Sequence, residues 1–249
     1  MIDLHSHILP GLDDGPETLE GSLELARAAL DDGTELIAAT PHVRDDYPTT
    51  AVEMESAVEE VRTALSDAGV GLELRPGGEL ALERLDELEP MELRRFGLGG
   101  SVKYLLVESP YYGWPLDLEE RLFRLQATGM TPVLAHPERN AEVQAEPERL
   151  RPLVERGALV QLTAASVDGR LGRRPQQTSS LLLELGLAHL LASDAHAPAV
   201  RAAGLSAAAR SLGDQALARW LTRDVPAALL ASEELPPRPA PTRRRWFSR

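Results

Sequence analysis

The chain has 249 residues, a formal net charge of −13 and no cysteine. Its length suits one domain with a full core, and its acidity argues against nucleic-acid binding through a basic surface. The missing cysteine excludes hydrolases with a thiolate nucleophile and fits a reducing compartment. The N-terminus shows no signal-peptide pattern and no apolar run is long enough to cross a bilayer, so we expect a cytoplasmic protein without a transmembrane segment.

Helix and strand patterns alternate from the N-terminus onward. An apolar stripe with helical spacing occupies 19–30 and is stopped by Gly33, and the apolar run 35–40 then predicts a strand. Thr50 and Glu53 form a capping-box signature, which predicts that the next helix begins directly after Thr50.

The same alternation continues through the second half of the chain. Asp117 and Glu120 predict another capping box, for a helix that Gly129 ends, and a helix over 147–157 precedes the strand pattern 159–162. Helix, glycine, apolar run and polar motif recur in the rhythm of parallel βα units. We therefore expect an α/β fold near the size of a (β/α) barrel, with the functional residues at the C-terminal ends of the strands.

The domain boundary is predicted near the C-terminus. No linker pattern interrupts 1–235, which predicts a single domain, whereas 236–249 is rich in proline and arginine and predicts a disordered tail. The stretch 238–249 carries five arginines and no acid. Such a tail could contact an anionic membrane surface or an acidic kinase segment, and a solvated end is the simpler alternative.

Histidines and acids at the ends of apolar runs are the sharpest chemical signal. In His5-Ser-His7 the two rings are two residues apart, so on a strand they face the same side and can bind one ion. Acids that end buried strands are costly unless they are paired or metal-bound. Nitrogen and oxygen donors suit Zn, Mn or Fe, and the set can hold more than one ion. The candidates on this pattern are His5, His7, His42, Glu79, Glu108, His136, Asp194 and His196.

Two arginines and one further histidine complete the polar candidates. Arg139 and Arg201 follow two of the histidine motifs, and their planar forks suit phosphate oxygens. His189 lies within an apolar run and is interpreted as structural. The pattern leaves open whether an aromatic cluster packs its own loop or forms a wall for the substrate: Tyr111, Tyr112 and Trp114.

These motifs, in this order, resemble the polymerase and histidinol phosphatase (PHP) family, and within it the bacterial tyrosine-protein phosphatases of capsule and exopolysaccharide gene clusters. The resemblance runs from residue 1 to about residue 201. The phrases that carry it are His5-Ser-His7-Ile-Leu-Pro-Gly-Leu-Asp-Asp14-Gly, Ala-Thr-Pro-His42, Gly-Gly-Glu79, Val-Glu108-Ser-Pro, Leu-Ala-His136-Pro-Glu-Arg139 and Ala-Ser-Asp194-Ala-His196. The Arg-rich tail departs from the family and leaves docking and a homo-oligomeric assembly open.

The resemblance implies a distorted (β/α)7 TIM-like barrel of the PHP type with three metal ions, usually manganese and sometimes iron or zinc. It adds Asp14, which by pattern alone is typical of a turn. The implied ligand sets are His5, His7, Glu79 and Asp194 for one ion; Asp14, His42 and His196 for a second; and Glu108 and His136 for a third, with Glu79 bridging.

The function implied by the resemblance is hydrolysis of protein phosphotyrosine on a bacterial tyrosine kinase that controls capsule or exopolysaccharide synthesis. Arg139 and Arg201 would orient the phosphate. A first alternative keeps the site but takes histidinol phosphate or another small phosphomonoester. A second is a metal-dependent amidohydrolase, although the only lysine, Lys103, begins its strand rather than ending it. A third is a non-catalytic regulator that binds phosphotyrosine.

Overall fold

Parallel strands follow one another round a ring in the computed structural model, which describes residues 1–108, 110–197 and 204–240. One sheet has the order β1-β2-β5, and the other has the order β10-β9-β8-β7-β6-β3-β4. The strands are β1 (Ile2–Ser6), β2 (Leu36–Ala39), β3 (His42–Arg44), β4 (Tyr47–Pro48), β5 (Glu73–Arg75), β6 (Glu79–Leu80), β7 (Tyr104–Glu108), β8 (Thr131–Ala135), β9 (Leu159–Thr163) and β10 (Leu190–Ala192). Among these pairings only that of β3 with β4 is antiparallel.

Two bent strands join the sheets into one barrel. Thr40 and Pro41 separate β2 from β3, and 76–78 separate β5 from β6, so each pair is one strand with a break at a proline. The ring closes beside β10, where Ser6 bridges Ala195 in parallel and the His7 N–H donates to the Ala195 carbonyl at 2.9 Å. Counting each bent strand once, the barrel has the seven strand positions of the predicted distorted (β/α)7 fold, which is confirmed.

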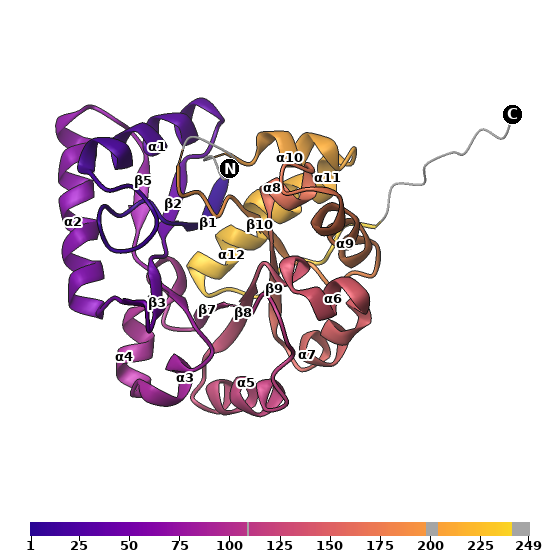
Figure 1. Cartoon of the computed structure of the whole chain (residues 1–249). Coiled ribbons are helices and arrows are strands. Elements are labelled where there is room, and N and C mark those ends of the chain that lie inside the picture. Colours follow the sequence, from indigo (N-terminus) through magenta and orange to yellow (C-terminus); the bar gives the residue numbers. More distant parts are fainter. Residues whose placement is uncertain (109, 198–203, 241–249) are drawn as a thin grey trace, which may run out of the picture.

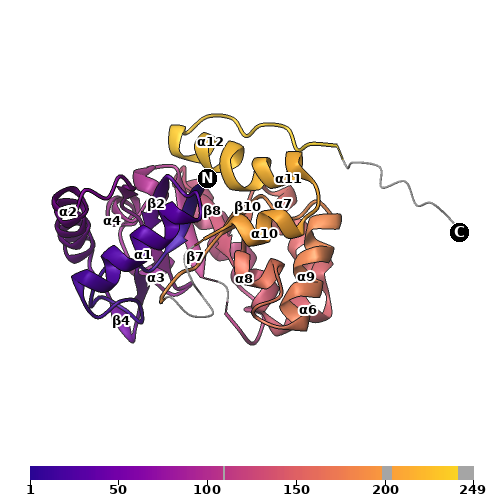
Figure 2. The same cartoon turned by 90° about the horizontal axis from the view of Figure 1, so that it is seen from above.

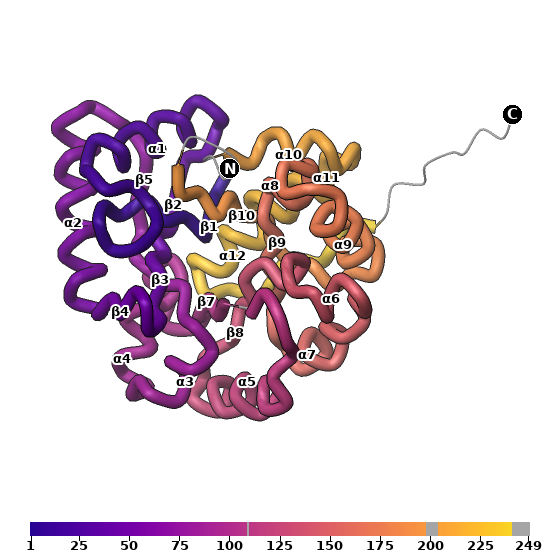
Figure 3. Tube along the Cα trace, viewed as in Figure 1, coloured from indigo at the N-terminus to yellow at the C-terminus, as the bar shows by residue number. Residues whose placement is uncertain are grey.

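Helices surround the strands, as Figure 1 shows, and the chain runs round the barrel in sequence order (Figure 3). The longer ones are α1 (Leu19–Asp31), α2 (Ala51–Asp67), α5 (Leu118–Ala127) and α9 (Arg173–Glu184). The shorter ones are α3 (Arg84–Glu87), α4 (Pro90–Arg95), α6 (Ala141–Ala145), α7 (Arg151–Glu155), α8 (Ala164–Val167), α10 (Ser206–Ser211), α11 (Gln215–Arg219) and α12 (Val225–Ala231). Helical turns of other types are η1 (Leu98–Gly100), η2 (Pro137–Arg139), η3 (Pro147–Leu150) and the π-helical η4 (Trp220–Asp224).

The C-terminal helices lie along one side of the molecule in Figure 2, where α12 packs against β1 and η1. Because η1 leads into the start of β7, this side is the N-terminal end of the barrel. Gly99 has a φ of +66°, and a Cβ there would lie 2.1 Å from the Leu230 side chain, so only glycine allows α12 to approach this closely.

The predicted helix starts are confirmed in one case and wrong in another. Thr50 caps α2 through a reciprocal capping box with Glu53, as predicted. Asp117 makes no side-chain cap bond to α5, because its carboxylate instead accepts a hydrogen bond from Arg121 Nε at 2.7 Å. The helix predicted over 147–157 divides into η3 and α7, the latter with Pro152 in its first turn.

The described part of the segment predicted as a tail, 236–240, begins in contact with the body. The Trp220 indole N–H donates to the Pro236 carbonyl at 2.9 Å. Arg238 donates to the carbonyls of Leu183 and Ala188, and its guanidinium lies 5.6 Å from the centre of the Trp220 ring. Residues 241–249, which include the other four arginines of that segment, lie outside the described residues. No helix in the described ranges is long and apolar enough to cross a membrane.

Candidate metal centre

The structure brings all nine predicted metal ligands together at one end of the barrel. All but Asp14, which lies in the loop between β1 and α1, lie at or near a point where a strand ends or bends, so the backbone brings the side chains to a common space. All are buried except Asp14, whose side chain is 37% exposed, and Glu108, which lies at the border. The nine residues are His5, His7, Asp14, His42, Glu79, Glu108, His136, Asp194 and His196.

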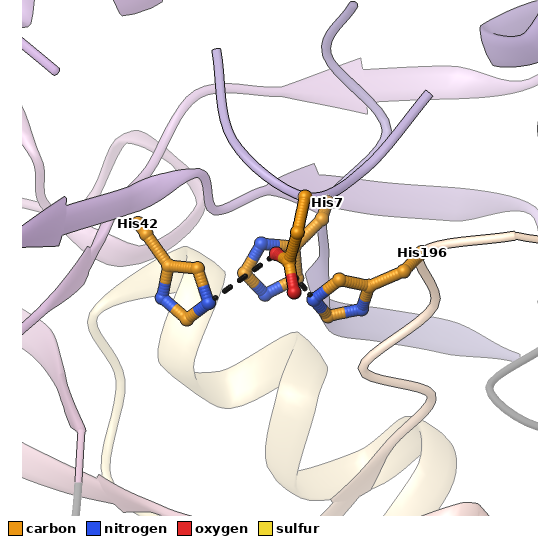
Figure 4. A group of neighbouring side chains, drawn as sticks. His7, His42 and His196 are labelled. Carbon is orange, nitrogen blue, oxygen red and sulfur yellow. Dashed lines mark ion pairs between the residues drawn. The ribbon is translucent and has the colours of Figure 1, made fainter. Parts of the chain in front are cut away.

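One group of donors is built round Asp14. Its Oδ1 atom lies 3.0 Å from His196 Nε2 and 3.5 Å from His42 Nε2. The His7 ring stacks on the His196 ring with 3.8 Å between centroids. Figure 4 shows the rings of His7, His42 and His196 gathered round one carboxylate. Three imidazoles and a carboxylate oxygen within one space are a set of donors that a divalent ion prefers.

Glu79 is the centre of the remaining donors. Its Oε1 lies 2.8 Å from His136 Nε2, and its Oε2 lies 3.0 Å from His42 Nδ1 and 3.3 Å from His5 Nε2. The side chain is completely buried. Burial opposes the charge, but His5 and His136 beside it hold the pKa of this carboxyl well below its usual range. With His7 Nε2 also 3.3 Å from Oε2, the carboxylate reaches four imidazoles, so it could be shared between two ions.

Asp194 faces the same space from the end of β10. Its Oδ1 lies 3.4 Å from His7 Nε2 and 3.5 Å from His5 Nε2, and its Oδ2 accepts a hydrogen bond from Arg139 Nη1 at 2.7 Å. Burial opposes its charge, yet the neighbouring histidines lower the pKa of Asp194 below that of an ordinary aspartate. The carboxylate therefore links the donor cluster to an arginine.

The grouping differs from the ligand sets implied by the resemblance, most clearly at Glu108 and His136. Glu108 groups with His42 and Glu79, whereas His136 groups with His5 and Glu79. The resemblance placed Glu108 and His136 on one ion. Glu79 belongs to both observed groups, which agrees with a bridging role for it.

Two of the ligand candidates have backbone conformations that non-glycine residues rarely adopt. His136 has a φ of 35° and Asp194 a φ of 52°. Left-handed residues of this kind cost roughly 1–3 kcal/mol and cluster at functional sites. At both positions the turn directly follows a strand and points the side chain at the cluster.

The donor atoms of the nine candidate residues suit metal ions better than they suit hydrogen bonds to one another. Among the described residues, three buried atoms of the cluster have no hydrogen-bond partner: Glu79 Oε2, His42 Nδ1 and His136 Nδ1. Leaving buried polar atoms unsatisfied costs about 1–3 kcal/mol each. Bound divalent ions would satisfy lone pairs that now face each other, so the donor chemistry fits a metal centre.

Two supporting residues were missed by the sequence analysis. Asp13 Oδ2 lies 2.6 Å from His7 Nδ1 and accepts from the His42 N–H at 3.0 Å. Gln161 Oε1 lies 2.9 Å from His5 Nδ1. Because these oxygens can only accept, each ring carries its hydrogen on Nδ1 and turns Nε2 toward the cluster. The Asp-Asp-Gly motif was the available signal for Asp13. A Cβ on Gly15 would lie 2.1 Å from the His7 carbonyl oxygen, so the glycine lets the loop that carries Asp13 pack against His7.

Arg139 borders the cluster, whereas Arg201 lies outside the described residues. The Arg139 guanidinium pairs with Asp194 and lies 4.7 Å from the centre of the Tyr111 ring. Tyr111 in turn stacks on His136, with ring centroids 5.9 Å apart and planes 2° from parallel. The fork is therefore fixed in direction by a carboxylate and by an aromatic face.

The aromatic cluster divides between the two roles that the pattern left open. Tyr111 joins the site, and burial raises its pKa to about 12, so its hydroxyl stays protonated. Trp114 instead packs beneath Arg149, whose guanidinium is 5.6 Å from the ring centre. Tyr112 is 84% exposed.

A second arginine, missed by the sequence analysis, lies beside Glu108. Arg44 Nη1 is 3.2 Å from Glu108 Oε1, and its guanidinium is 5.2 Å from the centre of the Tyr47 ring. Tyr47 stacks on His42 with 5.8 Å between centroids. The antiparallel β3–β4 hairpin places both side chains here, and the pairing of Arg44 with Tyr47 and Glu108 leaves no motif in the sequence.

His189 and Lys103 lie away from the cluster. His189 precedes β10, and its Nδ1 accepts a hydrogen bond from the Val160 N–H at 3.1 Å, in agreement with the predicted structural role. Lys103 precedes β7, at the opposite end of that strand from Glu108. A bridging lysine of the amidohydrolase kind is therefore absent from the cluster in the described ranges.

Known structures resemble this architecture. A solved structure titled "Crystal structures of YwqE from Bacillus subtilis and CpsB from Streptococcus pneumoniae, unique metal-dependent tyrosine phosphatases" matches with a TM-score of 0.85 and 32% identity, covering 97% of this chain and 100% of that one. A β-aspartyl dipeptidase from Fervidobacterium islandicum matches at a TM-score of 0.57 and 15% identity, covering 92% and 72% of the two chains, and shares the fold alone.

Relatives found by sequence carry the same kind of name, tyrosine phosphatase, as the first of these structures. The tyrosine-protein phosphatase YwqE of Bacillus subtilis is 37% identical over 197 residues, which are 79% of this chain and 77% of that protein. The putative tyrosine-protein phosphatase CapC of Staphylococcus aureus is 32% identical over 199 residues, with the same two shares. The model of the capsular polysaccharide synthesis family CpsB/CapC matches residues 1–230. The chain belongs to the CpsB/CapC family, and the resemblance that its motifs predicted is confirmed.

Proposed function

We propose that this chain is a metal-dependent protein-tyrosine phosphatase. The observation that carries the proposal is the convergence of five histidines and four acids beside a fixed arginine, in a chain without cysteine. The names of relatives that match over most of the chain support the same activity. A phosphatase without cysteine needs a nucleophile other than a thiolate, and a metal centre supplies one.

The nine ligand candidates would hold the ions, with Glu79 as the bridging carboxylate. When bound, such ions neutralise charge on phosphoryl oxygens and make water a stronger nucleophile at neutral pH. We propose manganese as the metal, with iron or zinc as substitutes, since imidazole and carboxylate donors suit all three. Asp13 and Gln161 would keep the His7 and His5 rings directed at the ions.

The phosphate would be oriented by arginine. Arg139 is already held by Asp194 and by the Tyr111 ring, so little conformational entropy is lost when its fork binds phosphate oxygens. Arg201 is proposed for the same role from the motif alone. A tyrosine leaving group has a pKa of about 10, so its departure needs no strong general acid.

The substrate we propose is a bacterial tyrosine kinase that acts in capsule or exopolysaccharide synthesis; the family's description supports capsular polysaccharide synthesis as the context. Action in the cytoplasm and a homo-oligomeric state stay predictions. Contact of the basic C-terminal segment with a membrane or a kinase also stays a prediction.

The test measures hydrolysis by metal-stripped protein with and without Mn²⁺, on a phosphotyrosine peptide, a phosphoserine peptide and histidinol phosphate. We expect activity that returns with Mn²⁺ and favours the phosphotyrosine peptide. Metal-dependent activity on histidinol phosphate alone would keep the site and overturn the substrate. Bound metal without activity on any of the three would overturn the proposed function.

A further inference from the structure

A groove of about 670 Å³ opens beside the metal centre and extends over α6 and the start of α9. Tyr111 and Arg139 line its inner end, where they contact His136 and Asp194. The groove continues into a second hollow of about 540 Å³, which shares the side chain of Gln144 as a wall. A molecule whose phosphate lies at Arg139 therefore has a path along the surface away from the metal centre.

The outer part of this groove has uncompensated positive charge. Arg173 and Arg174 line it, are exposed, and form no ion pair with any carboxylate in 1–108, 110–197 or 204–240. Most other described arginines do form such pairs, in a chain whose net charge is −13. Two unpaired cations side by side on an acidic protein indicate an anionic partner.

The position of the two arginines strengthens this interpretation. They are the first two residues of α9, which has twelve residues, no acid in its first turn and no side-chain cap at Gly172. Cations at a helix N-terminus oppose the helix dipole. An anion bound there would satisfy free N–H groups and reverse that unfavourable interaction.

The groove also offers apolar surface of the kind that a peptide covers. Tyr112 lines it and is 84% exposed, and Pro175 and Leu171 lie along it. Leu181, 40% exposed, continues this surface into the second hollow. Exposed aromatic rings next to arginine are typical of recognition surfaces.

We propose that this groove binds the peptide segment beside the phosphotyrosine, and that Arg173 and Arg174 bind glutamate or aspartate side chains of that segment. The proposal rests on the proposed function and adds a sequence preference to it. The inner end would hold the phosphotyrosine at Arg139, while the outer end selects for acidic neighbours.

The experiment compares phosphotyrosine peptides that carry three glutamates on the N-terminal side, on the C-terminal side, or glutamines at both. The readout is the ratio of kcat/KM for each acidic peptide to that for the neutral one, in Mn²⁺-loaded protein. The variant is R173Q/R174Q. R210Q/R219Q is the matched control, because it removes two exposed arginines that do not line the groove.

We expect the parent to prefer one acidic peptide by about two- to tenfold, the range that two exposed ion pairs supply. The preference should fall close to one in R173Q/R174Q, persist in R210Q/R219Q, and weaken in high salt. Equal rates on all peptides in the parent, or an unchanged preference in R173Q/R174Q, would overturn the proposal. A parent without activity on any phosphotyrosine peptide would overturn the phosphatase assignment as well, so the two failures are distinct.

Discussion

The two ends of the barrel contain histidine in opposite environments. At the C-terminal end of the strands, five buried rings face carboxylates and one another, and some of their nitrogens lack hydrogen-bond partners. At the N-terminal end, His189 receives a backbone hydrogen bond from Val160 and packs near Trp220, with 6.5 Å between ring centroids. Burial alone therefore does not separate a functional histidine from a structural one; the partners of its nitrogens do.

The same contrast extends to the surroundings. The C-terminal end concentrates buried charge and two left-handed residues, His136 and Asp194, which all oppose stability. The N-terminal end is covered by α12, whose Leu229 is completely buried. We infer that the first end was selected for metal chemistry and the second for stability, and four substitutions test this.

The largest effect is expected for His7→Ala. This change removes a ring that lies between the Asp14 group and the Glu79 group, so turnover should fall by at least about a thousandfold, while circular dichroism shows an intact fold. His189→Asn is the matched control, since it removes the one histidine outside the cluster. Full phosphatase activity in His7→Ala would contradict the metal centre.

Asp13→Asn should have a smaller effect on the same end of the barrel. The asparagine keeps the shape but loses the charge that holds His7 Nδ1, and loss of such a support typically lowers metal affinity 10–100-fold. Titration of metal-free protein with Mn²⁺, followed by recovered activity, measures the change. Recovery at high Mn²⁺ is expected, and a permanent loss of kcat would instead place Asp13 in the reaction itself.

Most of the residues that the structure gathers could be located from the sequence, because they end or closely follow apolar runs. A strand end and a polar residue are both local features, so His136 and Glu108 could be located without the structure. Asp14 required the family resemblance, because Asp-Asp-Gly is also an ordinary turn.

Two of the residues that sequence reasoning missed act through partners far away in the sequence. Gln161 reaches His5 across 156 positions, and Arg44 reaches Glu108 across 64. No local pattern records such pairings. The same reason explains the packing of Arg238 on the body, because its partner Ala188 lies 50 positions away. The failed cap at Asp117 is instead a local competition, because Arg121, four residues further along, binds the Asp117 carboxylate.

Leu229→Ala tests the other end of the barrel. Truncating a fully buried leucine costs about 2–5 kcal/mol of the free energy of unfolding, while kcat of the folded protein should not change. Urea unfolding measures the loss, and Leu116→Ala, at a side chain that is 104% exposed, is the control with no expected change. A fall in kcat without a fall in stability would contradict the division of roles between the two ends.

The smallest effect is expected for His189→Asn and depends on pH. Burial, and then the charge of Arg238, lower the pKa of His189 to about 4 in the folded protein, against about 6.5 when unfolded. Between these two pKa values the unfolded chain therefore binds a proton that the folded chain does not bind. The free energy of unfolding should fall by about 1–3 kcal/mol as the pH falls from about 6.5 to about 4. The Val160 N–H donates to Nδ1, which agrees with a neutral ring in the folded protein. Asparagine can accept the same bond without titrating, so urea unfolding of metal-free parent and variant should give curves that diverge only in this pH range. Parallel curves would mean that the histidine at this end of the barrel is not held neutral, and the contrast between the two ends would lose its electrostatic basis.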